Sequence, residues 1–141
     1  MPPTWVIVAE SSRARIFAMR GLANPLQELE DLVNPAGSEP ERALASDRPG
    51  RTTDSSARRR HAKEPQVSPR EQVALVFARE IADRIEQGRT HGKFEKLIIV
   101  AAPEFLGLLR RSLTETSRQK IWKEVRKNLV REDERIIRDH L

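Results

Sequence analysis

A long stretch without large apolar side chains interrupts this sequence. No large aliphatic or aromatic residue lies between Leu44 and Val67, and residues 35–67 contain four prolines and two glycines. Ordering a backbone costs about 1–2 kcal/mol per residue, and the burial of apolar surface is what offsets that cost. We therefore expect residues 35–67 to form an extended, flexible loop within one domain that spans residues 1–141.

The positive charge of the chain is concentrated in the same stretch. The formal net charge is +5, and residues 42–63 alone contain seven basic residues against two acidic ones. The seven are Arg42, Arg48, Arg51, Arg58, Arg59, Arg60 and Lys63. A local excess of this kind suits a polyanion such as RNA. The alternative is a solvated loop that has no partner.

Composition excludes several classes of function. The chain has no cysteine, which excludes disulfides, thiolate metal sites and cysteine nucleophiles. The apolar run 5–9 is too short for a signal-peptide core, and the run 97–102 is too short to cross a bilayer. We expect a cytoplasmic protein without membrane insertion, and we find no motif for a cofactor or for specific binding of DNA.

The first part of the sequence predicts an antiparallel hairpin. Residues 4–9, TWVIVA, are apolar and β-branched, and residues 14–19, ARIFAM, alternate, with polar ESSR between them. Residues 26–34, LQELEDLVN, fit either a third strand or a short helix, because their leucines also have helical spacing.

The second part alternates helices with strands. Ser68, Pro69 and Glu71 form the start signal of a long amphipathic helix that ends around residues 88–92. A buried strand is predicted at 96–102, followed by a helix at 104–113.

The sequence does not fix the secondary structure of the last third of this part. Residues 119–130 fit either a helix or an edge strand, and 132–141 fit a helix. The whole order predicts an α/β (α+β) fold, with a single mixed sheet and flanking helices.

Arginines of the basic stretch are the binding candidates. Guanidinium groups fork onto phosphate oxygens and stack on bases, which favours the consecutive Arg58, Arg59 and Arg60. Arg48 and Arg51 flank a turn-forming Pro-Gly pair. The nucleic-acid-binding set is therefore Arg48, Arg51, Arg58, Arg59, Arg60 and Lys63.

His61 is the one candidate for catalysis. The neighbouring arginines lower its expected pKa and keep the imidazole neutral. Nothing in the sequence fixes a nucleophile beside it, and a hydrogen bond to Glu64 is the simpler interpretation.

Metal chemistry has less support. His61, His91 and His140 share no ligand spacing, so no metal site is predicted. Glu10, Glu30 and Asp31 lie near predicted strand ends, where a nuclease could gather carboxylates around magnesium.

Two tryptophans and one glycine are expected to serve packing rather than ligand binding. Trp5 and Trp122 are expected in the core. Gly107 costs helix stability, about 1 kcal/mol relative to alanine, and is expected to allow close packing against a neighbouring element.

Five blocks carry a family resemblance: TWVIVAESSRARIFAM, ELEDLVNP, SDRPGR, RHAKEP and KLIIVAAPEFLGLLRRSL. In this order they resemble the bacterial host attachment protein family, from residue 5 to residue 141. The resemblance implies a role in attachment to a host cell.

A more distant resemblance concerns chemistry. The same order of elements is similar to the middle domain of eukaryotic and archaeal peptide-chain release factors, a ribonuclease-H-like mixed sheet. There a loop holds a Gly-Gly-Gln tripeptide, which implies hydrolysis of peptidyl-tRNA. Here GRTTDSSARRRHA occupies that place without the tripeptide, and this departure argues against the enzyme.

Three functions follow from these patterns. The first is a non-enzymatic module that contacts RNA or the ribosome through residues 42–63. The second is a protein–protein or host-cell attachment factor, and the third is a tRNA-ester hydrolase with altered loop chemistry.

Overall fold

The computed structural model of the protein describes residues 1–38 and 68–141. Its first part forms β1 (Thr4–Ala9), β2 (Arg13–Met19), β3 (Gln27–Val33) and the short 3-10 helix η1 (Pro35–Ser38). Its second part forms α3 (Pro69–Thr90), β4 (Lys96–Val100), α4 (Pro103–Ser112), α5 (Glu115–Arg118), β5 (Ile121–Val125) and α6 (Glu134–Asp139). The ambiguous run 26–34 is thus a third strand. The first four residues of the predicted loop form η1.

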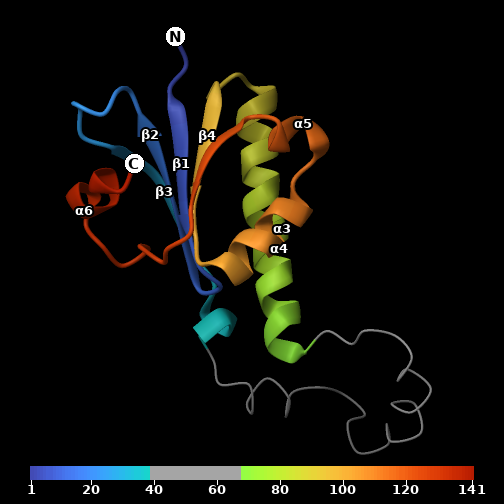
Figure 1. Cartoon of the computed structure of the whole chain (residues 1–141). Coiled ribbons are helices and arrows are strands. Elements are labelled where there is room, and N and C mark those ends of the chain that lie inside the picture. The colour runs from blue at the N-terminus through green and yellow to red at the C-terminus, as the bar shows by residue number, and fades with distance from the viewer. Residues whose placement is uncertain (39–67) are drawn as a thin grey trace, which may run out of the picture.

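The strands form one mixed sheet in the order β3-β2-β1-β4-β5. β1 pairs antiparallel with β2 and parallel with β4, and β5 continues in parallel beside β4. Helices α3 and α4 lie on one side of the sheet and α6 lies on the other (Figure 1). The prediction of a single mixed sheet with flanking helices is confirmed.

Central strand β1 is buried on both faces because each face is covered. Ile7 faces the cluster formed with α3 and α4, where it joins Phe77 and Ile81. Its neighbours Val6 and Val8 face the opposite cluster, which contains Ile137 of α6. Successive side chains of a strand point to opposite faces, so a strand covered twice has a continuous apolar run such as WVIVA.

Helix α3 begins and packs as its sequence predicts. The Ser68 hydroxyl accepts a hydrogen bond from the backbone N–H of Glu71 at 3.1 Å, and Pro69 occupies the first turn. The buried face of the helix includes Phe77, Ile81 and Ile85.

Strand β5 lies in the run 119–130, for which the sequence allows either a helix or an edge strand. Residues 121–125 form an edge strand beside β4, and the described residues 119–130 contain no helix. The two tryptophans differ: Trp5 is buried, whereas Trp122 is 58 % exposed on β5. The prediction that Trp122 belongs to the core is therefore wrong, because the strand that carries it lies at the edge of the sheet.

The expectation for Gly107 is also wrong. A Cβ built on this residue would have no neighbouring atom within 4 Å, so no close packing requires glycine. The glycine that does allow close packing is Gly88 on α3, where a Cβ would lie 2.3 Å from the Cη2 atom of Trp5.

Candidate functional site

The predicted binding residues lie outside the described part of the structure. Arg48, Arg51, Arg58, Arg59, Arg60 and Lys63, and with them His61, all fall within 39–67. The structure does locate the two residues that bound this segment, Ser38 at the end of η1 and Ser68 at the start of α3.

The first boundary is fixed to the turn between β1 and β2. The Asn34 side-chain amide donates to the carbonyl of Ser11 at 2.9 Å, and the Ser11 hydroxyl donates to the carbonyl of Gly37 at 3.2 Å. A Cβ on Gly37 would lie 1.9 Å from the Ser11 carbonyl oxygen, so a larger residue cannot take this position without a shift of the backbone. This close contact holds η1 against the end of the sheet.

Both boundaries lie at the same end of the molecule. We call it the carboxyl end of the sheet, because β1, β4 and β5 all finish there, at Ala9, Val100 and Val125. Figure 1 shows η1 and the first turn of α3 below this end. The segment 39–67 therefore leaves and re-enters the described structure beside the ends of three parallel strands, where open α/β sheets commonly bind ligands.

Three polar side chains gather at the carboxyl end of the sheet. The Glu10 carboxylate accepts a hydrogen bond from the hydroxyl of Ser12 and another, at 2.6 Å, from the side-chain amide of Asn128. The Asn128 side-chain oxygen in turn accepts from the N–H of Val130 at 3.2 Å. Both oxygens of Glu10 are thus engaged, and the cluster joins the β1–β2 turn to the chain that follows β5.

Helix α4 also begins at this end. Its N-cap residue, Ala102, provides no side-chain hydrogen bond, and Pro103 fills the first helical position. Helices α3 and α4 both direct their N-termini, which carry partial positive charge, toward the carboxyl end of the sheet. Their first turns also contain Glu71 and Glu104, which offset part of this charge.

The structure does not assemble the carboxylates of the nuclease hypothesis. Glu30 pairs with Arg84 of α3 at 2.6 Å, and Asp31 pairs with Arg13 at 2.6 Å, whereas Glu10 is held by Ser12 and Asn128. Across residues 1–38 and 68–141, no three acidic or histidine side chains lie close enough to hold a metal ion. The Arg13 guanidinium also lowers the pKa of Asp31, chiefly through its hydrogen bond.

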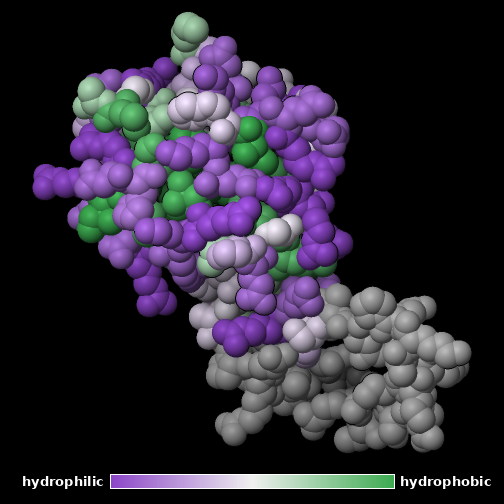
Figure 2. All heavy atoms as spheres, in the orientation of Figure 1, coloured by the Kyte–Doolittle hydropathy of each residue, from purple (hydrophilic) through white to green (hydrophobic). Residues whose placement is uncertain are grey.

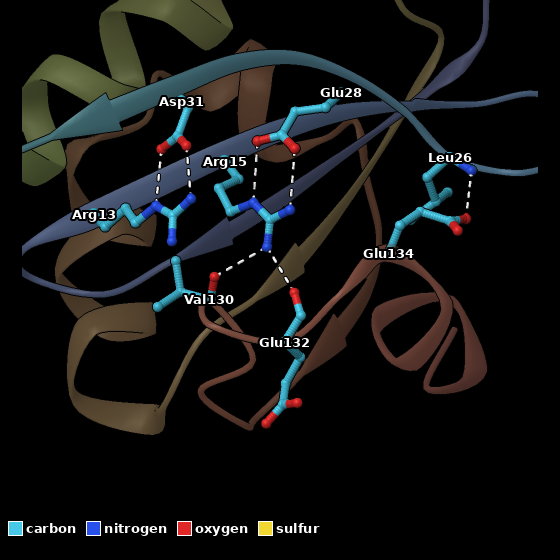
Figure 3. A network of polar contacts seen from close by, with 8 residues as sticks. All are labelled: Arg13, Arg15, Leu26, Glu28, Asp31, Val130, Glu132 and Glu134. Atoms are coloured by element: carbon cyan, nitrogen blue, oxygen red, sulfur yellow. Dashed lines mark hydrogen bonds and ion pairs between the residues drawn. The ribbon is translucent and has the colours of Figure 1, made fainter.

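Arg15 on β2 is the centre of a second polar network, on the α6 side of the sheet (Figure 3). Its guanidinium forks onto Glu28 of β3, with both N–O distances at 3.0 Å. The remaining nitrogen donates to the carbonyls of Val130 at 3.0 Å and Glu132 at 2.7 Å. A single side chain thus ties the C-terminal segment to the hairpin, beside the Glu10–Asn128 contact.

A third network fixes α5 to α3 through Glu86. The carboxylate accepts from Arg89 at 2.8 and 3.1 Å, from the buried Ser117 hydroxyl at 2.7 Å and from Thr114 at 3.1 Å. The Arg89 guanidinium, followed by the Ser117 hydroxyl, lowers the pKa of Glu86 to about 2.

This lowered pKa predicts a pH-dependent stability. The free carboxyl of glutamate titrates near pH 4.5. The stabilisation by ionised Glu86 is therefore complete above about pH 4.5 and is lost as the pH falls toward 2.

We expect Glu86→Gln to lower the free energy of unfolding at pH 7, measured with urea. The difference in this free energy between the variant and the wild type should narrow between pH 5 and pH 2.5. Glu80→Gln, at an exposed position of the same helix, is the control. A gap that stays constant over this pH range would contradict the assignment.

The surface offers little apolar area on the face seen in Figure 2. Apolar residues occur there in small groups interrupted by hydrophilic ones, and hydrophilic residues predominate. Large continuous apolar patches usually mark protein docking sites, and this face shows none outside the grey region.

Comparison with known families covers nearly the whole chain. The model of a family described as "protein required for attachment to host cells" matches residues 5–141. The chain belongs to this host attachment family. A search of curated proteins finds no match. The resemblance proposed from the five sequence blocks is thereby confirmed, and the family suggests an attachment-related role. The structure adds that, in this member, no helix of residues 1–38 and 68–141 is long and apolar enough to cross a membrane.

Sequence reasoning missed several residues of the polar networks. Asn128 and the carbonyls of Val130 and Glu132 are more than 100 residues from their partners Glu10 and Arg15, and no local pattern signals such contacts. The pairing of Arg13 and Arg15 with acids of β3 is diagonal, because Val33 lies opposite Arg13 and Asp31 lies opposite Arg15. The basic residues of one strand and the acidic residues of the next indicate such pairing, but not which residues pair.

Proposed function

We propose that this host attachment family member is a cytoplasmic, non-enzymatic protein that binds RNA through residues 42–63. The observation that carries the proposal is the charge distribution. Seven basic residues and two acidic ones lie in this range, an excess equal to the formal net charge of the whole chain. Phosphate groups are the ligands that such an excess suits best, and arginine binds them in a forked geometry.

The described structure supports this proposal through the two boundaries of the segment. η1 is held against the β1–β2 turn by Ser11, Asn34 and Gly37, and α3 begins with a capped first turn. One boundary is the start of α3 itself, and α4 begins at the same end of the sheet, so the partial positive charge of both helix N-termini also favours a polyanion there. The segment that contains the basic sequence therefore begins and ends at fixed points on one end of the described structure.

We infer the nature of the RNA from the order of elements, which is similar to that of release-factor middle domains. A domain of that kind works on the ribosome beside tRNA, so ribosomal RNA or tRNA is the proposed partner. The Gly-Gly-Gln tripeptide is absent, and Gly50 is the only glycine between residues 48 and 64. For this reason we propose binding without hydrolysis. Attachment to a host would then be a consequence of RNA binding inside the bacterium.

Direct binding of RNA tests the proposal. We expect Arg58→Ala/Arg59→Ala/Arg60→Ala to weaken binding of tRNA, and cosedimentation with ribosomes, at least tenfold at about 0.1 M salt, since three phosphate contacts are lost. The matched control, Arg79→Ala/Arg111→Ala/Arg135→Ala, removes the same charge from exposed positions of α3, α4 and α6 and should cost much less. Equal binding by the two triple variants would refute a role for residues 58–60.

The proposed location has its own test. Protease added to intact bacteria should leave the protein uncut, whereas the same protease should cut it after lysis. Cleavage in intact cells would contradict the cytoplasmic part of the proposal and favour direct contact with the host.

A further inference from the structure

Trp122 is an exposed aromatic residue on an edge strand. Its side chain is 58 % exposed, although tryptophan is usually largely buried. Ile121 pairs with Leu97 and Lys123 pairs with Ile98, so a bulge leaves Trp122 with no residue of β4 opposite it. Bulges re-aim side chains at sheet edges, and this one presents an indole ring that the core does not use.

A cation already lies over this ring. The Lys96 ammonium is 5.0 Å from the centroid of the Trp122 ring, within the range of a cation–π contact. One face of an exposed indole is thereby placed next to a positive charge at the start of β4.

More positive charge follows along β5. Residues 118–127 contain five basic residues and a single acid, Glu124. Arg118 pairs with Glu115 and Lys123 donates to the carbonyl of Leu141, so the charge that faces solvent beyond the strand comes from Arg126 and Lys127. Glu124 is paired with Arg110 of α4, so its charge is neutralised within the chain. Arg126 and Lys127 are exposed just beyond the strand. Arg126 is four positions after Trp122, about 13 Å along an extended backbone, a span of roughly two nucleotides in an extended single strand.

We propose that Trp122 and its neighbouring cations form a platform for single-stranded RNA. An unpaired base stacks on the indole, and the phosphates on either side lie near Lys96 at one end and Arg126 and Lys127 at the other. Base–aromatic stacking combined with a positively charged track is the general chemistry of single-strand binding. The inference rests on the proposed RNA-binding function and adds a contact that reads unpaired bases, on residues separate from 42–63.

Charge complementarity favours RNA over an added peptide strand at this edge. Lysines on an edge strand disfavour pairing with another strand, and β5 has only five residues. An exposed tryptophan does not help to prevent strand pairing, whereas its indole ring can stack on a nucleic-acid base.

The test uses the full chain and two fluorescein-labelled probes, a ten-nucleotide oligouridylate and a ten-base-pair RNA duplex. We expect Trp122→Ala to weaken binding of the single strand at least fivefold and binding of the duplex less than twofold. Trp122→Phe should recover most of the affinity, because it keeps an aromatic face. Leu22→Ala, which shortens another exposed apolar residue, is the control and should change neither affinity.

Tryptophan fluorescence gives a second readout. Oligouridylate should quench the emission of exposed Trp122 in the wild type and quench nothing in Trp122→Phe, because Trp5 is buried. If Arg58→Ala/Arg59→Ala/Arg60→Ala lost affinity for the oligouridylate and Trp122→Ala did not, the platform would be refuted and the proposed function would stand. Absence of binding by the wild type to the oligouridylate, tRNA and ribosomes would overturn both.

Discussion

Arg15→Ala is expected to lower the free energy of unfolding by about 2–4 kcal/mol. The Arg15 side chain is only 11 % exposed, and it bonds the Glu28 carboxylate and two backbone carbonyls at once. Truncation leaves these acceptors without their donor in a partly desolvated site. It also removes the contact between the guanidinium and the Phe17 ring, whose centroid lies 4.9 Å away. Urea denaturation at pH 7 measures the change.

Two further variants, Arg15→Lys and Arg13→Ala, show which contacts of Arg15 account for the lost free energy of unfolding. Lysine keeps the charge but cannot fork onto Glu28 while reaching both carbonyls, so an intermediate loss is expected. Arg13 pairs with Asp31 in a more exposed position, where ion pairs contribute about 1 kcal/mol or less. If Arg15→Ala lowered the free energy of unfolding no more than Arg13→Ala does, the claim that Arg15 stabilises the C-terminal segment would be refuted.

Gly88→Ala is expected to destabilise the protein by about 1–3 kcal/mol, although alanine is the better helix former. An added Cβ would lie 2.3 Å from Cη2 and 2.6 Å from Cζ3 of Trp5. That ring is buried and lies against Phe94, with the two ring centroids 4.8 Å apart, so the added Cβ requires this packed pair to shift. Thermal or urea unfolding measures the effect.

Gly107→Ala is the matched control on helix α4. Its added Cβ meets no atom within 4 Å, so the gain in helix propensity should raise the free energy of unfolding by up to about 1 kcal/mol. The two substitutions are chemically identical and should have opposite signs. If Gly88→Ala raised the free energy of unfolding, the Trp5 ring would have moved without cost, and the close packing of Gly88 against Trp5 would be refuted.

Strong local patterns were enough to predict most of the fold. The apolar runs of β1 and β4, the capped start of α3 and the mixed sheet all follow from periodicity and turn chemistry. The run 119–130 could not be decided, because its helix propensity competes with a tertiary contact. Pairing of β5 with β4 outweighs local preference there, and the resulting edge position exposes Trp122.

The two glycines show a similar limit. Gly88 and Gly107 each interrupt a helical pattern, and the sequence alone does not say which one meets a neighbour. Only the position of the Trp5 ring in the folded protein distinguishes them.

The candidate site was less predictable than the fold. Charge counting makes residues 42–63 the predicted binding segment, and this stays a prediction because the segment lies outside the described residues. The Glu10–Asn128 and Arg15–Val130 contacts join residues more than 100 positions apart, and chain topology alone brings them together. Of the carboxylates of the nuclease hypothesis, Glu10 follows the end of β1 as expected, whereas Glu30 and Asp31 lie within β3. Arginines and an amide engage the three carboxylates separately.

The salt dependence of tRNA affinity tests the central claim most directly. Each phosphate contact contributes about −0.7 to −0.9 to the slope of log affinity against log salt concentration. The account predicts that removing Arg58, Arg59 and Arg60 makes this slope shallower by about 2, whereas the Arg79/Arg111/Arg135 control keeps the wild-type slope. Identical slopes for wild type and the residue 58–60 variant would contradict the proposal that this basic sequence binds RNA.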